Sequence, residues 1–132
     1  MDSLKQLFRE REIEELVEQN KEIKVRKKED IRRILKLLAD QKCTNKELRN
    51  IIKINPFVLT RNPDALEELI YKLKEYKVLH VNKVFDCYPY ITNKYAYEID
   101  TFFFIKQKEG LDDKEIIKIL EEEPYQIDMT TK

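Results

Sequence analysis

The chain has 132 residues, of which 39% are charged and 42% hydrophobic, with one glycine and no tryptophan. This length is typical of one domain, and the scarcity of glycine argues against a β fold, whose tight turns often need glycine at positive φ. Lysine and arginine together number 26 and balance 26 acidic residues. The zero net charge argues against extensive binding to duplex nucleic acid, which usually requires a basic domain.

No apolar run reaches the roughly 18 residues that suggest a membrane span. The first fifteen residues contain Asp2, Glu10, Glu12, Glu14 and Glu15, a composition that fits neither a secretory signal nor an organellar transit peptide. We therefore expect a cytoplasmic location and no membrane partner.

The N-terminal residues 3–20 are predicted to form one amphipathic helix, because apolar residues recur at helical spacing. Two apolar groups carry this spacing, and the apolar stripe shifts between them: Leu4, Leu7 and Phe8, then Ile13, Leu16 and Val17. Residues 21–28 are charge-dense and form either a connector or a continuation of this helix. A further helix is predicted over 29–40, where five Ile and Leu residues form a broad apolar face.

The later part of the chain repeats a pattern with a period of about 34 residues, as in repeat proteins. Three segments end in a proline followed by an aromatic residue: Pro56-Phe57, Pro89-Tyr90 and Pro124-Tyr125. The prolines lie 33 and 35 residues apart. Proline lacks a backbone donor and disfavours helix at the preceding residue, so each first helix is predicted to end there. The aromatic residue is then predicted to fill the space between helices.

Capping residues mark several predicted helix starts. Thr44 with Glu47, and Asp112 with Glu115, form capping boxes, whereas the middle copy lacks such a cap. Asn62 followed by Pro63 begins a helix that runs to about residue 76. In the next copy Asn93 is predicted to cap a helix over 94–109, which Gly110 ends.

Residues 31–127 resemble the repeats of the mitochondrial transcription termination factor (mTERF) family. The similarity lies in the lead-in Gly110-Leu111-Asp112 and in the proline element Asn55-Pro56-Phe57-Val58-Leu59. In the other copies Lys42 and Glu75 stand where the lead-in has glycine. The fold that we expect is therefore all-α, a short helical-repeat (mTERF-like) array with an N-terminal amphipathic helix, and the resemblance implies nucleic-acid binding. We divide the chain into residues 1–28, the N-terminal helix with its basic connector, and residues 29–132, the repeat domain.

Two groups of basic residues are candidates for contacts with phosphate. Residues 21–36 contain eight basic and three acidic residues, and a second group lies on one face of the helix that follows Thr44. Such residues also serve as solvated helix faces with i,i+4 pairs, and both interpretations stay open. The candidate nucleic-acid-binding residues are Lys24, Arg26, Lys27, Lys28, Arg32, Arg33, Lys46, Arg49 and Lys53.

The remaining chemistry-bearing residues form no recognisable catalytic or metal pattern. Cys43 and Cys87 are expected to be buried free thiols, and the lone His80 to face solvent. Phe102 and Phe103 are expected in the core, with at least one ring of the run 102–104 pointing outward, where stacking on unpaired bases is one possible use of the aromatic residues. We expect no enzyme activity, cofactor, metal or small-molecule substrate. DNA or RNA is the expected partner, and the alternative is a protein adaptor that binds another protein or forms a homodimer.

Overall fold

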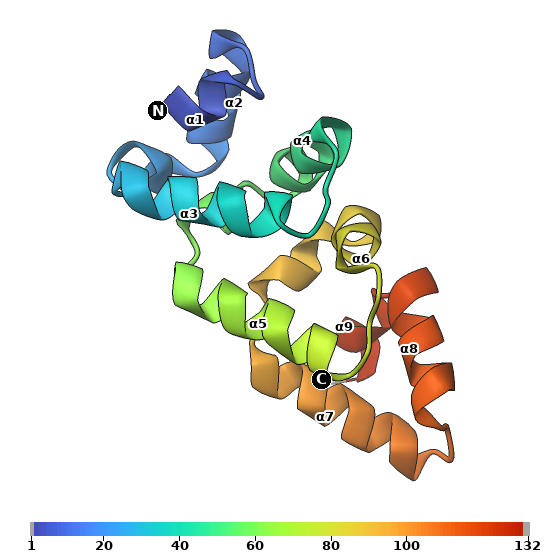
Figure 1. Cartoon of the computed structure of the whole chain (residues 1–132). Coiled ribbons are helices and arrows are strands. Elements are labelled where there is room, and N and C mark those ends of the chain that lie inside the picture. The colour runs from blue at the N-terminus through green and yellow to red at the C-terminus, as the bar shows by residue number, and fades with distance from the viewer. Residues whose placement is uncertain (1, 131–132) are drawn as a thin grey trace.

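The computed structural model describes residues 2–130, and the side chains of residues 4–129 (Figure 1). This part of the chain is all-helical and has no strand, as the composition predicts. The α-helices are α1 (Asp2–Lys5), α2 (Glu10–Gln19), α3 (Lys28–Ala39), α4 (Asn45–Ile54), α5 (Pro63–Glu75), α6 (Val81–Cys87), α7 (Ala96–Lys108), α8 (Asp113–Glu122) and α9 (Gln126–Thr130). The 3-10 helices are η1 (Lys21–Lys24), η2 (Pro56–Thr60) and η3 (Pro89–Asn93).

The order α-helix, 3-10 helix, α-helix recurs along the chain, and we call each such set a unit. The units are α2–η1–α3, α4–η2–α5 and α6–η3–α7, and α8 with α9 follows them. The first unit was not visible in the sequence, because Lys21 stands where the later units have proline. Leu4, Phe8, Leu16 and Ile23 belong to the same hydrophobic core cluster as the later helices. The N-terminal segment therefore packs on the other units and does not extend away.

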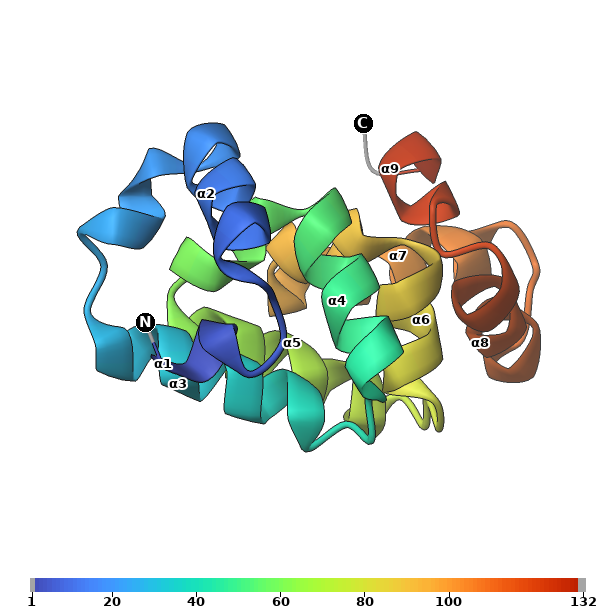
Figure 2. The ribbon, with the colours of Figure 1, turned by 90° about the horizontal axis from the view of Figure 1, so that it is seen from above.

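The helices form two rows that follow the chain from one end of the molecule to the other. In Figure 1, α3, α5 and α7 lie one after another in one row, and α4, α6 and α8 lie in the second, with contacts between successive members of each row. The 3-10 helices also contact in order, η1 with η2 and η2 with η3. Seen from above, the colours run from blue to red along the long axis (Figure 2). No helix within 2–130 is long and apolar enough to cross a membrane.

Two buried asparagines connect successive units where the first helix of a unit ends. The Asn20 side-chain amide donates to the carbonyl of Pro56 at 3.2 Å and to Thr60 Oγ1 at 2.9 Å. Asn55, which is 35 residues later and fully buried, donates in the same way to Pro89 O at 3.4 Å and Thr92 Oγ1 at 2.9 Å. Buried amides need such partners, so these bonds fix the register between neighbouring 3-10 helices.

The predicted helix starts are largely confirmed. Thr44 Oγ1 accepts from the Glu47 amide at 3.1 Å while Glu47 Oε1 accepts from the Thr44 amide at 2.9 Å, and Asp112 with Glu115 repeats this capping box. The Asn62 side chain accepts from the amide of residue 64 at 2.9 Å. The middle copy has no side-chain cap. The helix predicted over 29–40 is α3, and each proline follows the end of a helix as expected.

Two helix predictions are wrong. The helix expected over 3–20 is interrupted between Lys5 and Glu10, at the point where the apolar stripe shifts, since one straight helix could not bury both apolar groups. Asn93 does not cap the last long helix. It ends η3 and accepts the Asn55 amide at 3.0 Å, and α7 begins at Ala96.

The loops that join one unit to the next share a left-handed residue just after a helix. Lys42 has φ 66°, Lys77 has φ 72° and Gly110 has φ 97°. Gly110 ends α7 as predicted. The residue of the middle copy that corresponds to Gly110 is therefore Lys77. The prediction that Glu75 stands at this position is wrong. This region of φ favours glycine, so the two lysines adopt it at a conformational cost.

Candidate nucleic-acid interface

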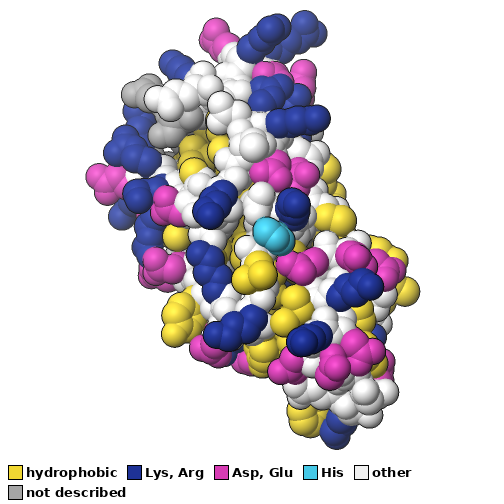
Figure 3. Space-filling model, turned by 45° about the vertical axis from the view of Figure 1, so that its right-hand side comes forward, with side chains coloured by type: hydrophobic (Ala, Val, Ile, Leu, Met, Phe, Trp, Pro, Cys, Tyr) yellow, Lys and Arg dark blue, Asp and Glu magenta, His cyan; other side chains and the backbone are white. Residues whose placement is uncertain are grey.

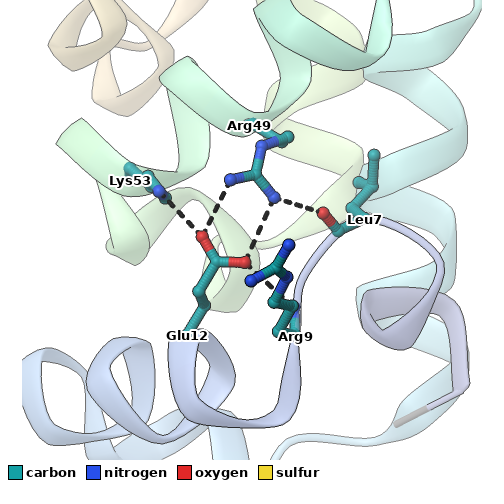
Figure 4. A network of polar contacts seen from close by, with 5 residues as sticks. All are labelled: Leu7, Arg9, Glu12, Arg49 and Lys53. Carbon is teal, nitrogen blue, oxygen red and sulfur yellow. Dashed lines mark hydrogen bonds and ion pairs between the residues drawn. The ribbon is translucent and has the colours of Figure 1, made fainter.

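Arg49 and Lys53, two of the predicted phosphate ligands, are engaged by Glu12 (Figure 4). Arg49 Nη2 and Lys53 Nζ each lie 2.8 Å from Glu12 Oε2, and Arg49 Nη1 donates to the carbonyl of Leu7 at 2.6 Å. The Arg9 amide donates to the other carboxylate oxygen at 3.0 Å. Hydrogen bonds from Arg49 and then Lys53 hold the pKa of Glu12 far below its usual range. This network attaches α2 to α4, and both cations share the single negative charge of Glu12.

Arg33 is engaged in a similar way by acidic residues of α5, the next helix in the row of α3. Its guanidinium lies 2.7 Å from Asp64 and 3.2 Å from Glu67, which raises its pKa. The Arg33 side chain therefore connects α3 to the acidic first turn of α5. These contacts, together with the Glu12 network, support the alternative interpretation, in which part of the basic residues form ion pairs within the protein.

Five of the predicted basic residues are exposed, and their side chains form no hydrogen bond or ion pair with the described part of the chain. They are Lys24, Lys27, Lys28, Arg32 and Lys46. The first three lie at the corner between η1 and α3, and Arg32 follows Lys28 by one helical turn. Lys46 is in the first turn of α4, whereas η2 follows the other end of that helix. The structure therefore brings four of these cations together and leaves Lys46 apart.

Arg26 is half-buried and differs from its lysine neighbours. Its Nε is buried without a hydrogen-bond partner, and Arg61, which lies 35 residues later, has the same buried Nε. The Arg61 guanidinium donates to the carbonyl of Lys94 and lies 4.8 Å from the centroid of the Tyr95 ring. Desolvation lowers the pKa of Arg61. Both arginines thus sit at the junction between a 3-10 helix and the following α-helix, where packing restricts access to a ligand.

The aromatic residues that follow the three prolines are exposed, which corrects the prediction that they fill the space between helices. Their exposed fractions are 54% for Phe57, 47% for Tyr90 and 45% for Tyr125. Aliphatic side chains of the two 3-10 helices that begin with proline are fully buried instead, such as Val58 in η2 and Ile91 in η3. One exposed ring therefore occurs at the same place in successive units. We name the surface formed by η1, η2, η3 and the turn at 124–125 the 3-10 edge.

Other residues named in the sequence behave partly as predicted. Phe102 and Phe103 are buried and Phe104 is exposed, and His80 is exposed. The cysteines are free thiols, but Cys43 is only half-buried and Cys87 is exposed, contrary to the prediction that both are buried. Cys87 is the last residue of α6. Burial nevertheless raises the pKa of Cys43 to about 12, so this thiol is not activated.

Charge is mixed on the face that Figure 3 draws. On the face in Figure 3, basic and acidic side chains are interspersed, and the histidine lies beside hydrophobic side chains. Among the residues searched within the described chain, no group of three His, Cys, Asp or Glu side chains is arranged to hold a metal ion. On this face the charges are not separated into a broad basic surface of the kind that duplex binding usually requires.

Comparison with known proteins provides no assignment. No family model, curated protein or solved structure matches this chain.

Proposed function

We propose that this chain is a non-enzymatic, mTERF-like helical-repeat module that binds single-stranded nucleic acid along its 3-10 edge, in a regulatory role. The observation that carries the proposal is an exposed ring after each of three prolines, in η2, in η3 and in the turn before α9: Phe57, Tyr90 and Tyr125. Unpaired bases stack on exposed aromatic side chains whatever their sequence. A surface with one ring per unit therefore suits a strand that passes along several units.

The cations at the N-terminal end of this edge supply the electrostatic contribution. Lys24, Lys27 and Lys28 lie at the end of η1, which contacts η2, and Phe57 is in η2. Backbone phosphates would meet these lysines while bases stack on the rings. A few unpaired lysines suit a single strand better than a duplex, which would require a larger basic surface than a chain with zero net charge provides.

Fluorescence anisotropy with a labelled dT12 or U12 oligonucleotide tests the proposal. About four phosphate contacts predict that affinity falls by roughly 50-fold between about 50 and 200 mM salt. The triple variant K24E/K27E/K28E should bind at least about tenfold more weakly. The matched control K83E/K114E/K118E reverses three other exposed lysines that have no described partner, and it should retain affinity. Absence of binding at low salt, or equal loss in both variants, contradicts the proposal.

The second candidate is a protein-interaction adaptor, and exposed aliphatic side chains favour it. Val25 is 82% exposed and Leu79 is 80% exposed. Zero net charge also fits this function better than the first. An adaptor that self-associates would show a mass above 16.1 kDa in light scattering, and one that binds only protein would show no salt-dependent affinity for either oligonucleotide.

A further inference from the structure

The outer face of α2 is an interface between units that lacks its neighbour. α2 begins at Glu10 and α4 begins 35 residues later, at Asn45. The two helices end 35 residues apart as well, so their residues correspond one by one. In α4 the face toward α2 contains Arg49 and Lys53, which bind Glu12, beside the buried Leu48 and Ile52. The residues of α2 at these four positions are Ile13, Glu14, Val17 and Glu18.

This face of α2 forms an open groove of about 710 Å³. Ile13 and Val17 are only half-buried there, whereas Leu48 and Ile52 are 6% and 0% exposed in α4. Glu10, Glu14 and Glu18 form an acidic row at i,i+4 spacing along α2, and Lys5, Lys21 and Lys24 also line the groove. The groove therefore combines an apolar floor with a row of carboxylates.

Two positions of this groove carry the opposite charge to their counterparts at the α2–α4 contact. There a glutamate from the preceding helix meets an arginine and a lysine, at 2.8 Å in each case. Here the corresponding positions are Glu14 and Glu18, which form no ion pair with the described chain. A helix packed against α2 in the same manner would complete the pairing if it carried a basic residue where α2 carries Glu12.

We infer that the α2 groove binds an amphipathic helix of a partner protein, one that covers Ile13 and Val17 and presents basic side chains to Glu14 and Glu18. A second copy of this chain fits less well. If the α8 helix of a second copy packed against α2, the residue of α8 that corresponds to Glu12 would face Glu14. That residue is Glu115, which is also acidic. Like charges in contact oppose association, so the charge pattern favours a basic helix over self-stacking. The inference does not depend on nucleic-acid binding at the 3-10 edge.

A pair of synthetic peptides tests the inference with the full chain. Both copy residues 4–26, and a hydrocarbon staple between the exposed positions 11 and 18, away from residue 12, keeps the α2 part helical, as circular dichroism can verify. One keeps the natural sequence, and the other carries E12R. Because the E12R peptide places a cation against Glu14 and Glu18, it should bind at least about tenfold more tightly than the natural peptide, with methyl chemical-shift changes at Ile13 and Val17.

Charge reversal on the protein provides the decisive comparison. The variant E14R/E18R should bind the natural peptide better than the E12R peptide, which inverts the preference. Both substitutions are at exposed positions, and the variant Glu15→Arg, also exposed, serves as the control that leaves the preference unchanged. No shift at Ile13 and Val17 with about 1 mM E12R peptide, or a preference that E14R/E18R leaves unaltered, overturns the inference.

Discussion

At the scale of single residues, polar side chains determine how neighbouring units align. Asn20 and Asn55 each end a helix and reach into the following unit, where their amides donate to a 3-10 carbonyl and a threonine hydroxyl. Burial makes these bonds matter, because an unpaired buried amide or hydroxyl loses its hydration without compensation. A register that satisfies both asparagines is therefore favoured over any slipped arrangement of the units.

Removing the Asn55 side chain is expected to destabilise the protein. Asn55→Ala deletes a fully buried amide with bonds to Thr92 and Asn93, which should lower the free energy of unfolding by about 2 kcal/mol. Urea unfolding followed by circular dichroism measures this difference. The control is Asn45→Ala at an exposed position, expected within about 0.5 kcal/mol of the natural protein. Similar losses in the two variants would show that the buried bonds contribute no specific stability.

The Glu12 carboxylate makes the attachment of the N-terminal unit sensitive to pH. Its pKa is held below the ordinary value of 4.5 by Arg49 and Lys53. A depressed pKa means that the ionised carboxylate stabilises the folded state fully above the unfolded pKa, and that this contribution declines as pH falls below about 4.5. Glu12→Gln should therefore be less stable than the natural protein at pH 7, and the difference should shrink in acid.

Thermal or urea unfolding at several pH values measures this trend. Glu15→Gln serves as the control, since Glu15 is exposed and forms no bond within the described chain. A stability difference between Glu12→Gln and the natural protein that stays constant from pH 7 to pH 3 would show that the ion pairs of Glu12 do not stabilise the fold.

At the scale of elements, short local sequences start and stop the helices. Capping boxes begin α4 and α8, prolines follow α4, α6 and α8, and left-handed residues end α3, α5 and α7. An isolated helix of ten to thirteen residues is only marginally stable in water. Packing between successive helices of a row therefore stabilises them. The lysines at two of the left-handed positions are the weakest local choices in this scheme.

Replacing Lys77 by glycine should stabilise the protein. Its φ of 72° costs an L-residue about 1 kcal/mol relative to glycine, although glycine loses some of this gain through the greater freedom of the unfolded chain. Lys77→Gly should raise the free energy of unfolding by roughly 0.5 kcal/mol or more, measured by urea unfolding. Lys77→Ala keeps the strained backbone and should show no comparable gain, so equal effects of the two substitutions would contradict this account.

At the scale of the whole molecule, stacking leaves two different surfaces available to partners. The 3-10 edge runs along the units and carries basic residues at its N-terminal end and Tyr125 beside Glu123 at the other. The outer face of α2 lies at the end of the stack, where no described helix meets it as α2 meets α4 through Glu12. A linear array of units thus offers a side surface for a strand and an end surface for a helix.

Much of this arrangement follows from local sequence, and the exceptions have physical causes. Thr44, Asp112 and Asn62 cap as predicted because the partners of a cap are three residues away or fewer. The engagement of Arg49 by Glu12 joins residues 37 positions apart, a contact that helix periodicity does not contain. The pattern of prolines does not reveal the first unit, because Lys21 stands where the later units have proline. Asn20 lies 35 residues before Asn55, and this interval could have identified the first unit.

The most direct test of the central claim, binding of a single strand along the 3-10 edge, is an NMR titration with U12. Backbone and aromatic resonances of the full chain are followed as the oligonucleotide is added at low salt. The account predicts the largest chemical-shift changes at Lys24, Lys27, Lys28, Phe57 and Tyr90, and little change in α8. Changes concentrated in α8 or in the loops between units, or no changes at saturating oligonucleotide, would contradict it.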